Sequence, residues 1–133
     1  MDAAQALADL TEISSQIRAA VLYGDDGSVL GSTLPDDARA KQLVELSNDL
    51  LAAARDAAPG DAELVQVEAA TEAGSVFVVG DEKRRIVATT DPEPTVGLVF
   101  YDLKSCLRGV DEEEEKPKRA PRRRKAVEGD DAA

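Results

Sequence analysis

The 133-residue chain contains no histidine. This absence removes the side chain that proteins use most often as a general base and as a transition-metal ligand. Without histidine, neither a Ser-His-Asp nor a Cys-His catalytic arrangement can form. The chain also lacks a glycine-rich phosphate loop of the Walker type and a nucleophile elbow. We therefore expect a protein that is not an enzyme and that uses no cofactor or metal ion.

Cysteine and long apolar runs are also scarce. The single cysteine, Cys106, excludes a disulfide within the chain and favours a reducing compartment. Cys106 falls on a predicted helix, where we expect a buried small side chain rather than a nucleophile. No apolar run approaches the roughly 18 residues that span a bilayer. The first residues lack the basic region and apolar core of a signal peptide. These features predict a cytoplasmic protein.

Charge is distributed unevenly along the chain. Residues 1–110 hold 9 Lys/Arg and 19 Asp/Glu, a net charge of −10. Residues 111–133 hold 7 Lys/Arg and 8 Asp/Glu, a net charge of −1. An acidic domain repels nucleic acid and anionic membranes and suits a basic partner surface. The length leaves room for one domain, which we assign to residues 1–110.

The longest helical pattern covers residues 35–58, and its apolar stripe is wider than packing on one sheet requires. The excess width predicts either a second packing partner, such as another copy of the helix, or a well-buried helix with tolerant alanine positions. The side chains assigned to the partner-facing part are Leu43, Leu46, Ser47, Leu50, Ala53 and Ala54. The opposite face carries Lys41, Glu45, Asn48, Asp49, Ala52 and Arg55 as a surface for a further partner.

Strand patterns flank this helix. Residues 17–23 and 28–34 form a predicted hairpin around the turn Gly24-Asp25-Asp26-Gly27. Three more strands are expected at residues 63–71, 75–80 and 84–90. Shorter helices are expected at residues 2–15 and 95–108, the latter capped by Gly109. This order predicts an α+β fold, with a five-stranded antiparallel sheet and helices on both faces.

The composition changes at residue 111. An acidic block at residues 111–115 precedes a basic block at 116–125, and acidic residues return at 128–131. Such a segment buries too little apolar surface to offset its ordering entropy, so residues 111–133 are predicted to be a disordered tail. A solvated tail, a nonspecific polyanion contact and a specific protein partner all stay open. The polyanion contact would use Lys116, Lys118, Arg119, Arg122, Arg123, Arg124 and Lys125.

Two local patterns, taken with the order of elements, resemble the Roadblock/dynein light-chain (Roadblock/LC7) family in its bacterial form. Residues 17–30, IRAAVLYGDDGSVL, are similar to the family's first hairpin. Residues 95–103, TVGLVFYDL, are similar to its last helix, which opens with a small or polar cap and an early glycine. The resemblance covers residues 3–110 and leaves out the tail.

The resemblance implies a sheet between the long helix on one face and the terminal helices on the other. Family members usually dimerise through the long helix and the strand that follows it, here residues 39–58 and 64–71. This adds Leu64, Gln66 and Glu68 to the expected interface. Bacterial members often regulate or scaffold Ras-like small GTPases, which dock on the paired long helices.

The leading hypothesis is therefore a non-enzymatic homodimer that regulates or scaffolds a small GTPase. The alternative is a nucleic-acid-associated adaptor that holds DNA through its basic tail and dimerises through its folded domain. The tail has no aromatic side chain for base stacking, so sequence reading of single strands is not expected.

Overall fold

The computed structural model describes residues 2–58, 66–80 and 83–124, with side chains up to residue 110. The elements are α1 (Ala3–Ile13), β1 (Ile17–Gly24), β2 (Val29–Ser32), α2 (Asp37–Ala57), β3 (Gln66–Thr71), β4 (Gly74–Gly80), β5 (Arg84–Thr90) and α3 (Val96–Arg124). Their order and type are those predicted from the sequence. Residues 63–65 of the predicted third strand, Leu64 among them, lie outside the described residues.

The five strands form one antiparallel sheet in the order β2-β1-β5-β4-β3. The strands β2 and β3 are therefore the two edges. The first hairpin turns at Gly27, whose φ of 86° suits glycine better than any residue with a side chain. In the second hairpin, Gln66 pairs with Val79 and Thr71 pairs with Gly74. This register determines which residues of β3 face which side of the sheet.

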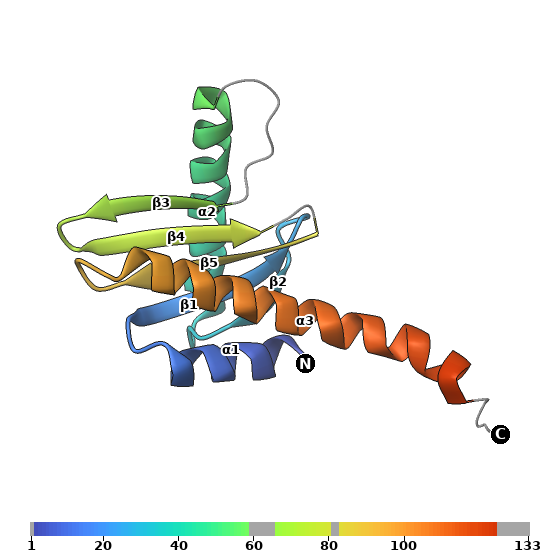
Figure 1. Cartoon of the computed structure of the whole chain (residues 1–133). Coiled ribbons are helices and arrows are strands. Elements are labelled where there is room, and N and C mark those ends of the chain that lie inside the picture. The colour runs from blue at the N-terminus through green and yellow to red at the C-terminus, as the bar shows by residue number, and fades with distance from the viewer. Residues whose placement is uncertain (1, 59–65, 81–82, 125–133) are drawn as a thin grey trace.

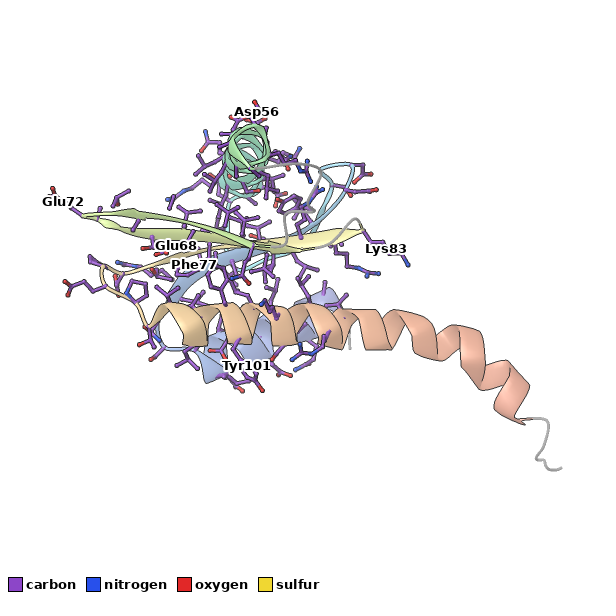
Figure 2. The ribbon with its side chains drawn as sticks, turned by 45° about the horizontal axis from the view of Figure 1, so that its top comes forward. Asp56, Glu68, Glu72, Phe77, Lys83 and Tyr101 are labelled. Atoms are coloured by element: carbon purple, nitrogen blue, oxygen red, sulfur yellow. The ribbon has the colours of Figure 1, made fainter. Side chains whose placement is uncertain are left out.

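The sheet lies between helices on both faces, as the sequence predicts (Figure 1). One face packs against α1 and α3 through a cluster that includes Leu10, Leu22, Phe77 and Leu103. The other face packs against α2 through Val21, Tyr23, Val44, Leu51, Val78 and Val87. Successive strand residues such as Phe77 and Val78 enter opposite clusters because side chains alternate across a pleated strand. Figure 2 shows the sheet edge-on, with α2 alone on one side and α1 and α3 on the other.

Capping residues explain where the first two helices begin. The Asp2 side chain accepts a 2.8 Å hydrogen bond from the Gln5 backbone N–H, which closes the first turn of α1. Asp36 likewise accepts a bond from Ala38 N, so α2 begins at Asp37 rather than at Pro35.

The end of α3 corrects the sequence prediction. The helix does not stop at Arg108 and Gly109 but runs to Arg124, and its last turns project beyond the sheet (Figure 1). Gly109 sits inside the helix, where glycine costs only about 1 kcal/mol relative to alanine. The acidic block stands four residues before the basic block, as in Glu112 and Lys116, a spacing that supports a helix. Pro117 and Pro121 lie in this extension, and each removes one backbone donor from the helix.

The backbone of α3 continues over residues 111–124 and leaves the folded domain, so these residues form a tail outside the sheet and its covering helices. Residues 125–133 lie outside the described residues, and there disorder stays a prediction. The last buried residue with a described side chain is Val110, next to the predicted domain boundary. None of the helices in the described ranges has both the length and the hydropathy of a membrane span.

Candidate dimer and partner surface

The helix α2 presents three different sides, and its most buried side faces the sheet. Ala40, Val44, Ser47 and Leu51 are buried there. Ser47 is fully buried, and its hydroxyl hydrogen-bonds the Tyr23 hydroxyl of β1 and donates to the Val44 carbonyl at 3.0 Å. Ser47 was assigned to the partner-facing part of the helix. Its burial against the sheet removes it from that surface, because the centre of the stripe points inward.

One flank of α2 is apolar and only partly covered. Leu43, Leu50 and Ala54 are half-buried, whereas Leu46 keeps 49% of its surface exposed. Ala53 is exposed at the margin of the same flank, three residues after Leu50. We call these five residues, Leu43, Leu46, Leu50, Ala53 and Ala54, the leucine flank. All of them were predicted from the sequence as partner-facing.

The sheet beside the leucine flank is also incompletely covered. A hollow of about 240 Å³ separates Leu43 and Leu46 from Ala19 of β1 and Thr89 of β5. Val67 and Val76 pack against the α2 cluster but stay half-buried. A single helix does not cover this half of the sheet, so apolar surface continues from the leucine flank onto β3 and β4.

The edge strand β3 adjoins this apolar surface. It pairs only with β4 within the described chain, so one row of its backbone donors and acceptors faces outward. Figure 1 shows the C-terminal turns of α2 extending past this edge. The end of α2 and the unpaired edge of β3 together form a surface on which another protein can pack.

The register of β3 separates the residues that the sequence grouped together. Glu68 pairs with Phe77, which belongs to the face covered by α1 and α3, and Figure 2 places both on that side. Gln66 pairs with Val79 and points the same way. Val67 and Ala69 instead share the α2 side with the leucine flank. Val67 and Ala69, rather than the predicted Gln66 and Glu68, therefore continue the apolar surface.

The remaining side of α2 is polar. Lys41, Glu45, Asn48, Asp49 and Arg55 are all exposed there, as predicted, together with Ala52. The described contacts of these side chains include no hydrogen bond or ion pair. This charged face is exposed on the side of α2 away from the sheet.

The rest of the described chain offers little for catalysis or metal binding. No group of three or more His, Cys, Asp or Glu in the described ranges is placed to hold a metal ion. Cys106 is buried, as predicted, and burial together with the Asp9 charge raises the pKa of its thiol to about 11. Such a thiol is a poor nucleophile at neutral pH. The side chains of residues 116–125 lie outside the described set, so their contact with polyanions stays a prediction.

Comparison with known proteins gives structural matches alone. No protein-family model matches the chain, and no curated protein matches its sequence. A Roadblock/LC7 domain structure from Streptomyces avermitilis superposes with a TM-score of 0.76 at 19% identity, covering 86% of this chain and 99% of that one. The gliding protein MglB from Thermus thermophilus gives 0.67 at 21% identity, covering 81% and 84%.

Two further structures with the same fold are an MglB from another organism and a profilin bound to actin. MglB from Myxococcus xanthus gives a TM-score of 0.64 at 16% identity, covering 85% of this chain and 84% of that one. A Loki profilin, solved in complex with rabbit actin, gives 0.55 at 15% identity, covering 80% and 94%. The higher scores of the Roadblock/LC7 and MglB structures agree with the resemblance seen in the sequence. The chain has the Roadblock/LC7 fold.

Proposed function

We propose that the protein is a cytoplasmic homodimer without enzymatic activity that regulates or scaffolds a small Ras-like GTPase. The observation that carries the dimer is the leucine flank of α2 beside a half-covered sheet. In a two-fold dimer the same patch meets itself, so the flank of one α2 fills the hollow next to the other. The unpaired edge of β3 can extend the sheet into the mate at the same time.

The structural similarity to MglB supports the proposal of self-association. One of the MglB structures, with 21% identity and a TM-score of 0.69, is described as having a tetrameric arrangement. That arrangement belongs to MglB. For this chain it supports, together with the leucine flank, an interface that brings two copies of α2 together.

The charged face of α2 supports the second half of the proposal. Pairing two copies through their leucine flanks leaves Lys41, Glu45 and Asp49 exposed on both helices. Mixed charges on paired helices form a polar platform that suits another folded protein, and residues 1–110 carry a net charge of −10. A partner with a basic surface is favoured. The choice of a GTPase as the partner rests on the resemblance of residues 17–30 and 95–103 to the Roadblock/LC7 family.

The dimer is tested by measuring the mass of the full chain in solution by light scattering at micromolar concentration. We expect twice the 14.1 kDa of one chain. A mass of one chain over the whole concentration range would remove the dimer from the proposal.

The GTPase partner is tested with purified Ras-like GTPases from the source genome, each loaded with GDP or with a non-hydrolysable GTP analogue. We expect one of them to bind in a nucleotide-dependent way. The double variant Glu45→Arg/Asp49→Arg should weaken binding by about tenfold or more, since it reverses two charges of the platform. The same substitutions should leave the mass of the dimer unchanged. Absence of nucleotide-dependent binding to any GTPase would refute the proposed partner.

A further inference from the structure

A second apolar surface lies on the opposite side of the sheet from α2. The helices α1 and α3 pack antiparallel (Figure 1), and the Gln16 side chain joins their ends by accepting a 2.6 Å hydrogen bond from Thr95 N. Between the two helices runs a groove of about 340 Å³, which we call the α1–α3 groove. A homodimer formed through α2 leaves this groove open in both copies.

The rim of the α1–α3 groove is unusually apolar for a free surface. Ile13 is 72% exposed, and Tyr101 is 63% exposed, and both line the groove. Leu98, 49% exposed, precedes Tyr101 by three residues on the same helix. Figure 2 shows Tyr101 on the side of α3 that points away from the sheet. Large side chains exposed together in this way mark an interaction surface more often than a solvated one.

Two carboxylates give the groove its chemical character. Asp102 lines the groove with only 7% of its surface exposed, and among the described residues it makes no hydrogen bond or ion pair. Asp9 faces it from α1, with one oxygen accepting a 2.9 Å bond from the neutral Gln5 amide. No lysine or arginine lines the groove. Arg108 of α3, next to the lining residue Gly109, donates to Ser105 Oγ at 3.2 Å.

Among the described residues, the buried side-chain oxygens without a partner belong to Ser14 and Gln66. The Asp102 oxygens therefore reach solvent in the groove, where a cation supplied from outside can pair with them. The groove therefore calls for an occupant that joins a positive charge to apolar surface. Lysine and arginine side chains have this character, since an apolar stem carries the charged head. Carried on a helix, they place a cation opposite Asp102 and an apolar side chain between Ile13 and Tyr101, as in other helix-in-groove complexes.

We propose that the α1–α3 groove binds a basic amphipathic helix of a partner protein, with a lysine or arginine of that helix paired to Asp102. The site is separate from the α2 surface, so the protein connects this partner to whatever the α2 platform holds. The apolar rim supplies contact area, and the Asp102 pair selects a basic helix over an acidic one.

The test uses the full ¹⁵N-labelled chain and the synthetic peptide acetyl-KLLKKLLKKLLK-amide, followed by amide chemical shifts. We expect shifts concentrated at Asp9, Ile13, Tyr101, Asp102 and Gly109. The charge-reversed peptide acetyl-ELLEELLEELLE-amide should cause none. Shifts confined to α2, or equal effects of the two peptides, would overturn the proposal.

Matched variants separate the groove from general attraction to an acidic protein. Asp102→Asn should weaken binding of the basic peptide by about tenfold or more, as expected for loss of a charge-assisted bond. Asp25→Asn, in the exposed first turn, changes net charge equally and should weaken it by less than twofold. Ile13→Ser, at a largely exposed position, tests the rim without disturbing the core. Equal losses in the two Asp variants would contradict a specific site.

A small cation serves as the last comparison. Butylguanidinium carries the charge and a short stem but no helix. We expect it to bind at least a hundredfold more weakly than the basic peptide. If it binds as tightly, the groove is a small-molecule cation site and the docking proposal is wrong.

Discussion

The two faces of the sheet are covered in different ways. Two helices, α1 and α3, pack on one face and bury Leu22, Phe77 and Leu103 completely. The other face has α2 alone, and residues at its margin such as Leu50, Val67 and Val76 stay half-buried. The first face has the larger buried cluster. The second face buries a smaller cluster and leaves apolar surface partly exposed, and this is the surface that the proposed dimer would cover.

The largest loss of folding stability is expected from truncating a buried side chain on the face covered by α1 and α3. Phe77 is fully buried and meets the Phe100 ring edge-on, with centroids 4.9 Å apart. Phe77→Ala should lower the free energy of unfolding by about 3–5 kcal/mol, because it removes a large buried ring and leaves a cavity. Urea denaturation measures this loss. Val76→Ala, at the neighbouring half-buried position, is the control, and an equal loss there would contradict the difference between the faces.

A substitution in the leucine flank should leave folding stability nearly unchanged and weaken the dimer instead. Leu46→Asp places a charge on an exposed position of the isolated domain, so the fold should tolerate it. In the proposed dimer the same charge is buried, and dimer affinity should fall by roughly 30-fold or more, the range of an interface hot spot. Light scattering over a dilution series measures the change.

Asn48→Asp is the matched control for this variant because it adds the same charge on the polar side of α2. It should leave the dimer unchanged. If Leu46→Asp has no effect on mass, the leucine flank does not form the interface.

A smaller and asymmetric effect is expected where α2 is tied to β1. Ser47 Oγ donates to the Val44 carbonyl, so its single proton is used and the Tyr23 hydroxyl is the donor between the pair. Ser47→Ala leaves that buried hydroxyl without an acceptor and should cost about 1–3 kcal/mol. Tyr23→Phe removes the donor while Ser47 keeps its bond, and should cost about 0.5–1.5 kcal/mol. Urea titrations measure the free energy of unfolding of both variants. A larger loss for Tyr23→Phe than for Ser47→Ala would reverse the donor assignment.

The mildest test changes no residue. Burial raises the pKa of the Cys106 thiol from 9.0 to about 11, so the folded protein holds the proton more tightly than the unfolded chain. At pH 8 iodoacetamide should therefore alkylate the folded chain about 100-fold more slowly than the chain in urea. Stability should fall as pH rises from about 9 towards 11, since the unfolded thiol ionises first. Equal alkylation rates would show that Cys106 is accessible.

Much of the fold was predictable because its signals are local. Turn residues at Gly24 and Gly27 and the alternation along the strands determine the order of the elements. The width of the apolar stripe on α2 predicts a second packing partner, and the structure leaves Leu46 exposed and Leu43 and Leu50 half-buried on one flank. These features depend on periodicity within one segment and need no knowledge of the neighbours.

The wrong predictions concern features that depend on contacts between segments, which the pattern of one segment does not contain. The stripe on α2 does not say which part faces the sheet, and Ser47 lies at its buried centre because Tyr23 of β1 supplies a partner. The register of β3 against β4 places Val67 rather than Glu68 beside α2. At Gly109 a local stop signal is overridden, because the residues on both sides continue the helix.

The projecting end of α3 has a consequence for how charge acts at a distance. At 1.5 Å per residue, the 14 residues from Asp111 to Arg124 carry the helix axis about 21 Å past the folded domain. Fields in physiological salt fade over about 8 Å, so the end of this spacer is electrically separate from the acidic domain. A partner held at the end of the α3 backbone therefore lies beyond the reach of the net charge of −10 on residues 1–110.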